Sequence, residues 1–276
     1  MTNSVQNRRK QIQQTKPIVT NGSMDVAQRG TSVTGITADG LRTCDRWRTN
    51  IDSYGTYTLS QSTTVPTGEG FTKSFKIDCT TADASPGSGD LFTFEQRFEG
   101  QEVQMFKKGT SSAERYTVAF WIRSNLTGNL ALNLVDSDNS RRVGSLVNIS
   151  SADTWEKKVI SFPKDTTGAF DDDTADSFRI QLFLGVGSNF TSGTLPTSAW
   201  ESATTANFAA GQSAFIGSST DNELYITGVQ IEVGDFNADT IPPFQFESIT
   251  ENLARCQRYF YKTFDQGTTP AQNVSD

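Results

Sequence analysis

Apolar and polar residues alternate with a period of two along most of this chain. The clearest runs lie at residues 71–79, 92–98, 116–122, 130–134 and 178–186. Successive side chains of a β-strand point to opposite faces of the sheet, so each run presents one apolar face to a core. Clusters of Gly, Ser, Thr, Asp and Pro between the runs predict loops. About ten strands joined in this way predict an all-β fold, a jelly-roll β-sandwich.

Two irregularities interrupt this pattern. Within residues 223–234 the apolar positions are even-numbered up to Ile226 and odd-numbered from Val229 onward. One extra residue in a strand changes the phase in this way, so the sequence predicts a β-bulge between them. The polar stretch at residues 187–211 is long for a loop inside a compact domain, which indicates either a functional loop or a cap.

One helical pattern stands near the C-terminus. Ser248 and Glu251 form a capping-box pair, and apolar residues recur at helical spacing as far as Phe264. We therefore predict a helix at residues 248–264 that packs on the sandwich. A shorter helix is predicted at residues 101–108.

The two ends of the chain are polar and have no strand or helix period. Residues 1–20 predict an extended N-terminal arm, because such a segment cannot bury enough apolar surface to fold alone. The jelly roll then spans residues 21–247. Residues 265–276 predict a polar tail that resembles the start of a linker, so we expect the natural chain to be longer.

Composition restricts the function. The net charge is −7, which disfavours nucleic acid as a partner, because nucleic-acid binding needs a basic face. No apolar stretch approaches the roughly 20 residues of a membrane-spanning helix, so we expect no membrane insertion. The N-terminus has basic residues but no apolar segment of the kind found in secretory signals.

Histidine is absent, which removes Ser-His-Asp and Cys-His nucleophilic sites. Cys44, Cys79 and Cys256 match neither a metal-site spacing nor a disulfide framework, so we expect three reduced, mostly buried thiols. A Cys44–Cys79 disulfide is the less favoured alternative. Glycoside hydrolysis by two carboxylates would need a spacing that sequence cannot show. The prediction is that the protein is not an enzyme.

A cluster of carboxylates suggests a metal. Clustered carboxylates on a loop are the ligands that Ca²⁺ prefers, and the alternative is a solvated acidic turn. We expect no required cofactor, with a structural Ca²⁺ as the one option. The candidate ligands are Asp171, Asp172, Asp173 and Asp176.

Three pairs of segments carry a family resemblance. They read NGSMDVAQRGTS at 21–32 with CDRWR at 44–48, FEQRFEG at 94–100 with YTVAFWIRS at 116–124, and ELYITGVQIEVG at 223–234 with PPFQFESITENLARCQRYFYKT at 242–263. In this order and spacing they resemble a domain of phage tail-fibre and virion appendage proteins from marine and cyanobacterial phages. That domain is similar to jelly-roll carbohydrate-binding modules.

The resemblance implies a bacteriophage virion structural protein, a tail fibre or surface appendage assembled in the host cytoplasm. We expect it to attach to other virion proteins through its N-terminal arm, with Arg8, Arg9 and Lys10 meeting carboxylates. The resemblance to fibre proteins also implies a homo-oligomer, a trimer. A capsid decoration protein is an alternative that keeps the virion location, on tail or capsid surface.

The other main alternative is a receptor-binding module that recognises a host surface glycan; a polysaccharide depolymerase is less favoured. An exposed aromatic ring offers a flat apolar face to a sugar ring. The candidate glycan contacts are Trp200, Phe190, Phe208 and, outside the long loop, Tyr54.

The motif residues also predict structural roles. We expect Arg29 to lie half-buried against a carboxylate or carbonyl groups, since its planar guanidinium suits such sites. Trp47 and Trp121 are candidates for the core, and Arg255, Gln257 and Arg258 for side chains that hold the C-terminal helix on the sandwich.

Overall fold

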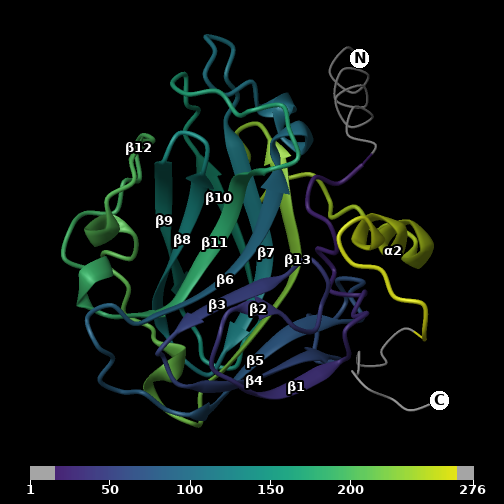
Figure 1. Cartoon of the computed structure of the whole chain (residues 1–276), viewed down its shortest axis with the longest axis vertical. Coiled ribbons are helices and arrows are strands. Elements are labelled where there is room, and N and C mark those ends of the chain that lie inside the picture. The colour runs from purple at the N-terminus through teal and green to yellow at the C-terminus, as the bar shows by residue number, and fades with distance from the viewer. Residues whose placement is uncertain (1–15, 266–276) are drawn as a thin grey trace.

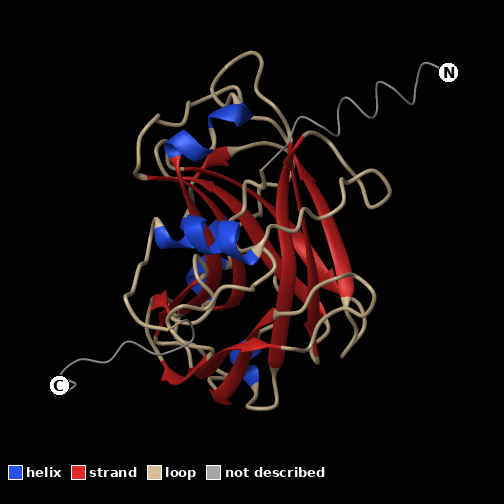
Figure 2. Ribbon diagram, turned by 90° about the vertical axis from the view of Figure 1, so that its right-hand side faces the viewer, coloured by secondary structure: helices blue, strands red, loops and turns tan. Residues whose placement is uncertain are grey.

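The computed structural model describes residues 16–265 of the chain. In that part, thirteen strands form two antiparallel sheets that pack face to face as two layers (Figures 1 and 2). This confirms the predicted all-β fold, a jelly-roll sandwich with one α-helix. Each sheet combines strands that are far apart in the sequence, so most neighbouring strands are not joined by a hairpin turn.

The first sheet has six strands. In spatial order they are β1 (Ser32–Ile36), β4 (Thr56–Ser62), β5 (Ser74–Thr81), β13 (Glu223–Val233), β7 (Tyr116–Ser124) and β10 (Glu156–Phe162). The second sheet has seven strands. They are β12 (Glu201–Ser202), β9 (Arg141–Ile149), β8 (Gly128–Asp136), β11 (Asp176–Val186), β6 (Leu91–Glu99), β3 (Arg48–Asp52) and β2 (Gly40–Leu41).

The core lies between the inner faces of the two sheets, where the predicted apolar positions point. Trp47 stacks on Phe94 with 4.8 Å between ring centroids, and both rings are almost fully buried. Burying a large apolar side chain contributes roughly 1.5–3 kcal/mol, so these rings are major contributors to stability. The role predicted for Trp47 is confirmed.

The predicted bulge is present in β13. The register between β13 and β7 shifts between Thr227 and Gln230. Gly228, inside the shift, has φ of 63°, and a Cβ there would come within 2.5 Å of the Phe71 ring. Both the left-handed backbone and the close ring favour glycine at this position.

The C-terminal helix is shorter than predicted. Helix α2 spans Ile249–Gln257, and the capping box of Ser248 and Glu251 at its start is confirmed. It ends at Gln257, and the next residue, Arg258, forms an ion pair with Glu99 of the sandwich. The predicted helix at residues 101–108 is instead two short 3-10 turns, η1 (Gly100–Glu102) and η2 (Gln104–Phe106).

The sandwich begins earlier than the predicted boundary at residue 21. Ile18 and Val19 are buried in the main core, and the backbone N–H and C=O of Thr20 both bond to the side-chain amide of Gln96. Arg255 of α2 donates to the carbonyl of Pro17, 2.9 Å away, so the helix lies beside the start of the described chain (Figure 1). Arg8, Arg9 and Lys10 lie outside the described residues.

The three cysteines are free and buried. The predicted reduced thiols are therefore confirmed, and Cys44 and Cys79 do not form a disulfide. Burial also raises the pKa of the Cys256 thiol to about 12.

Candidate functional site on the outer face of the seven-stranded sheet

A band of polar side chains crosses the outer face of the seven-stranded sheet. In β6 and β11 the apolar residues point into the core, so Glu95, Arg97, Arg179 and Gln181 point outward. The register places Arg179 opposite Arg97 and Gln181 opposite Glu95. On the other side of β11, the register runs from Arg179 through β8 to Arg142 of β9. Residues from three separate segments are thereby brought into one band.

Hydrogen bonds connect this band into a network. Arg142 Nη1 donates to Gln181 Oε1, and Gln181 Nε2 donates to Glu95 Oε2, each over 2.7 Å. Arg97 Nε donates to the other oxygen of Glu95, also over 2.7 Å, and Arg97 lies 3.4 Å from Asp176. The Glu95 side chain is fully buried, whereas Arg97 is 33% exposed. Buried acceptors thus orient guanidinium groups that reach solvent.

Two of the predicted glycan contacts lie beside this network. The guanidinium carbon of Arg142 is 3.7 Å from the centroid of the Phe208 ring, and that ring is 6.4 Å from Phe190. Asn133 of β8 donates to the Phe208 carbonyl over 2.8 Å, which fixes the long loop on the sheet. Both rings are partly exposed. Their role in glycan contact stays a prediction.

The expectation that Trp200 and Tyr54 are exposed is wrong. Trp200 is 5% exposed, its Nε1 donates to the Pro163 carbonyl over 2.8 Å, and its ring meets Tyr116 edge-on. Tyr54 is 1% exposed. Neither ring offers a free face to a ligand. The polar sequence around each residue suggested a surface loop, but both rings are buried against the sandwich.

A second group of aromatic residues lies on the outer face of the six-stranded sheet. Trp121 points outward and is partly exposed, which corrects its predicted place in the core. Trp155 meets Tyr225 edge-on at 6.2 Å, and Arg123 lies 5.1 Å from the Tyr225 ring. Tyr225 itself is only 6% exposed, so this group is the weaker candidate for a binding surface. Sequence reasoning missed it because Trp155 lies outside the strands, just before β10, and only the strand register brings it near Tyr225.

The four carboxylates predicted to hold calcium are not brought together. Asp171, Asp172 and Asp173 are exposed, and Asp176 forms ion pairs with Arg97 and Arg179. Within residues 16–265, no group of three or more Asp, Glu, Cys or His side chains is arranged to hold a metal ion. The calcium site stays a prediction without geometric support.

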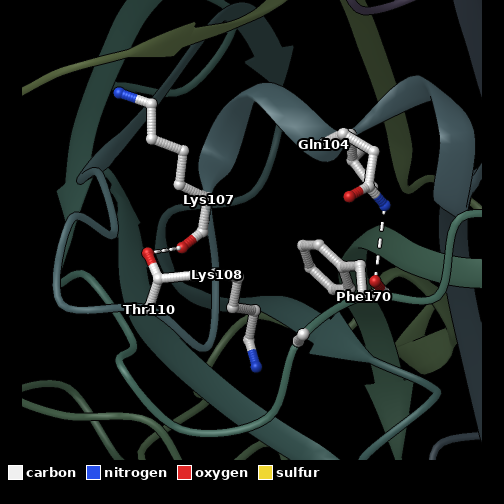
Figure 3. Close-up of a pocket in the computed structure, with 7 residues that line it drawn as sticks. Gln104, Lys107, Lys108, Thr110 and Phe170 are labelled. Atoms are coloured by element: carbon white, nitrogen blue, oxygen red, sulfur yellow. Dashed lines mark hydrogen bonds between the residues drawn. The ribbon is translucent and has the colours of Figure 1, made fainter.

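A cavity with a volume of about 400 Å³ lies beside η2 (Figure 3). Its polar lining residues already form hydrogen bonds or ion pairs within the protein. Gln104 Nε2 donates to the Phe170 carbonyl, and the Thr110 hydroxyl donates to the Lys107 carbonyl, as Figure 3 shows. Lys108 Nζ bonds to Asp136 and Asp165 in the protein interior. The cavity therefore presents no free reactive group.

Residues of the first and third pairs of motif segments meet at a cluster around Asp45. This carboxylate is buried and accepts from Gln28, at 2.5 Å, and from Arg29, at 3.2 Å. The prediction for Arg29 is confirmed. Asn21 bonds to the carbonyl of Asp45, and Gln28 also donates to the carbonyl of Phe260 beyond α2. The motif residues thus hold the first and last described segments together.

The clamping role predicted for the last helix is confirmed at two positions. Arg255 donates to the Pro17 carbonyl at 2.9 Å, and Arg258 makes a two-point contact with Glu99 at 2.6 and 3.1 Å. Bidentate charge-assisted pairs of this kind fix geometry as well as contribute energy. No such contact is formed by Gln257 in the described part of the chain.

One carboxyl group on the six-stranded sheet, that of Glu232 in β13, has a raised pKa. Burial raises the pKa of Glu232 to about 7, and in residues 16–265 its carboxyl has no hydrogen-bond or ion-pair partner.

No helix of the described chain is long and apolar enough to span a membrane.

No protein-family model matches the sequence, and no curated protein matches it. Solved structures do. The enzymatically active domain of bacteriophage CBA120 tailspike protein 4 aligns with 79% of this chain at 13% identity and a TM-score of 0.38, but the match spans only 21% of that chain. This chain thus matches about a fifth of the tailspike's length.

Two carbohydrate-binding structures are matched over nearly their whole length. TmCBM61 in complex with β-1,4-galactotriose aligns with 79% of this chain and 99% of its own, at 9% identity and a TM-score of 0.39. The family 11 module from Clostridium thermocellum, in complex with a β-1,3-1,4-mixed-linked tetrasaccharide, aligns with 75% and 98%, at 10% identity and a TM-score of 0.35. Scores of this size carry no argument about function, so the proposals below rest on the residues.

Proposed function

We propose that this protein is a glycan-binding module whose ligand lies on the outer face of the seven-stranded sheet. The observation that carries the proposal is the network that runs from Glu95 through Gln181 to Arg142, which stacks on Phe208. A sugar ring presents directional hydroxyl groups and flat apolar patches, and sites for such ligands combine aromatic surface with a few fixed polar groups.

The network supports binding because it is assembled before a ligand arrives. Gln181 is 4% exposed and bonds at both ends of its amide, so it cannot rotate freely. Ordering a flexible side chain costs about 0.5–1.5 kcal/mol on association, and a guanidinium already held in place avoids much of that cost. Arg142 and Arg97 are therefore suited to donate to hydroxyl or anionic oxygens.

We propose that the ligand is bound and not cleaved. A glycosidase needs two carboxyl groups roughly 5–10 Å apart, one of which donates a proton to the leaving oxygen. On this face, Glu95 accepts from Arg97 and Gln181, and Asp176 pairs with Arg97 and Arg179. Both carboxyl groups are thus engaged with donors of the protein itself and do not form a free pair across a cleft.

A glycan array probed with the purified chain tests this function. We expect binding to a defined set of glycans, a loss of about tenfold or more in Phe208→Ala and Gln181→Leu, and no change in Trp155→Ala on the opposite sheet. Release of reducing sugar from a bound glycan would contradict the non-enzymatic part. Binding that is lost only in Trp155→Ala would move the site to the six-stranded sheet.

We also propose that the module works in a phage particle, as a homotrimer attached through the part of the predicted arm that precedes Lys16, since Ile18, Val19 and Thr20 belong to the sandwich. The motif resemblance supports this role. Residues Arg8, Arg9 and Lys10 would meet carboxylates of another virion protein. Virions that incorporate a chain lacking residues 1–15 at normal copy number would argue against the attachment, and a monomer in sedimentation would argue against the trimer; the deletion stops before Ile18 and Val19 because they are buried in the core.

A further inference from the structure

We propose that the outer face of the seven-stranded sheet recognises an acidic glycan, whose carboxylate, sulfate or phosphate group is bound by Arg142. The inference rests on the proposed glycan-binding function and specifies its ligand class. It follows from the count of charges on this face, from the free donors of one arginine, and from the position of that arginine beside an aromatic ring.

Three arginines lie in one row across the sheet. Arg97 of β6 is opposite Arg179 of β11, which is opposite Val135 of β8, which is opposite Arg142 of β9. Neighbouring strands are about 4.8 Å apart, so the row extends over roughly 15 Å. That length matches a few sugar units more closely than a single small ion.

Two carboxylates balance only part of this charge. Glu95 and Asp176 both pair with Arg97, and Asp176 pairs with Arg179 at 2.7 Å. Arg142 forms no ion pair with any residue in the described range 16–265. Its register partner on β12 is Glu201, which is exposed and forms no ion pair with it among the described residues. The row thus carries an excess positive charge at Arg142, in a chain of net charge −7.

The guanidinium of Arg142 also has unused donors. Its single hydrogen bond runs from Nη1 to Gln181, while its flat face covers Phe208 at 3.7 Å. Nε and Nη2 have no partner among the described residues. These two groups point along one edge of the guanidinium, which is the edge that binds two oxygens of one anion.

The electrostatics of Arg142 favour an anion at this place. Burial lowers the pKa of Arg142 to about 10, the neighbouring charge of Arg179 acts in the same direction, and the charge of Glu95, with which Arg142 forms no ion pair, opposes them only in part. A half-buried cation without a counter-ion is unfavourable, and an anion that meets it removes that penalty. A neutral sugar would leave the charge unbalanced.

Binding measurements with matched polysaccharides test the inference. Isothermal titration compares four polymers. Polygalacturonate presents carboxylate groups, dextran sulfate presents sulfate groups and a polyphosphate-linked glycan presents phosphate groups, whereas neutral dextran presents the sugar alone. We expect at least one acidic polymer to bind more tightly than dextran by about tenfold or more, with affinity that falls as salt is raised. Arg142→Gln should remove that preference, and Arg142→Lys should restore part of it.

Arg115→Gln is the matched control, because Arg115 is an exposed arginine beside the six-stranded sheet and pairs with Asp235. It should leave the preference unchanged. If Arg142→Gln does not fold, the salt dependence and acidic preference of the unmodified chain decide the matter. Glycan binding with no preference for acidic polymers would overturn the inference and leave the proposed function intact, whereas no binding to any glycan would overturn both.

Discussion

The guanidinium of Arg29 lies 3.7 Å from the centroid of the Phe260 ring and 3.2 Å from the carboxylate of Asp45. Arg29 therefore contacts both the CDRWR segment at residues 44–48 and the segment that follows α2. Since the contact closes the chain on itself near its two described ends, the cluster contributes to stability and sets where the helix lies.

Replacing Asp45 by alanine should lower the free energy of unfolding by about 2–4 kcal/mol. Asp45 is 1% exposed, and its loss would leave Arg29 and Gln28 without their acceptor in a buried place. Urea denaturation followed by circular dichroism measures the change. Asp239→Ala, at an exposed position, is the control and should stay within about 0.5 kcal/mol of the unmodified chain. Equal stabilities for both variants would contradict the assigned role of the cluster.

The fold was accessible from sequence because it depends on local alternation. The run that contains Phe94 and Phe98 shows which residues point inward without any knowledge of neighbouring strands. The candidate site depends on register instead. The sequence shows that Glu95 and Gln181 are polar positions of their strands, but not that β6 and β11 are adjacent with these residues opposite each other. That pairing is set by the packing of the whole sandwich.

Replacing Trp200 by alanine should lower the stability of the fold. Any loss of glycan affinity would therefore accompany a loss of stability. The ring is buried against Tyr116, and its removal leaves a cavity, for which losses of about 3–5 kcal/mol are usual. Trp200→Phe should lose less, since it keeps most of the apolar volume but not the hydrogen bond to Pro163. Thermal melting compares the three proteins. A fully stable Trp200→Ala that binds glycan poorly would return Trp200 to the binding surface.

Trp200 and Phe208 also show the limit of reading exposure from composition. Both belong to a polar stretch with no strand period, which predicted exposed rings for both. Only Phe208 keeps partial exposure, because it lies over the outer face of the sheet, whereas Trp200 enters the core at the end of the sandwich. The difference arises from the path of the loop, which a period-two pattern does not predict.

The native chain should react very slowly with a thiol reagent. Cys44, Cys79 and Cys256 are buried and free, and burial raises the pKa of each thiol, so little reactive thiolate is present at neutral pH. Ellman's reagent should therefore detect almost no thiol in native buffer and all three in denaturant. Detection of one thiol in denaturant without reductant would reveal a disulfide and refute the assignment.

Glu232 should make stability fall as the pH rises. Burial raises its pKa to about 7 in the folded chain, from an ordinary value of 4.5. The protonated form is thus favoured by folding, so its contribution is complete below pH 4.5 and is lost as the pH rises through 7. The full difference amounts to about 3 kcal/mol at most, because one unit of pKa corresponds to about 1.4 kcal/mol.

Comparing Glu232→Gln with the unmodified chain isolates this contribution from other titrating groups. Glutamine keeps the shape of the protonated acid, so the two proteins should be nearly equal in stability at pH 4.5, and the variant should be more stable by about 2–3 kcal/mol at pH 8. Glu69→Gln, at an exposed position, should show no such pH-dependent difference. Urea denaturation at four pH values between these limits provides the measurement. A difference between Glu232→Gln and the unmodified chain that stays constant with pH would show that the carboxyl is ionised and solvated in the folded state.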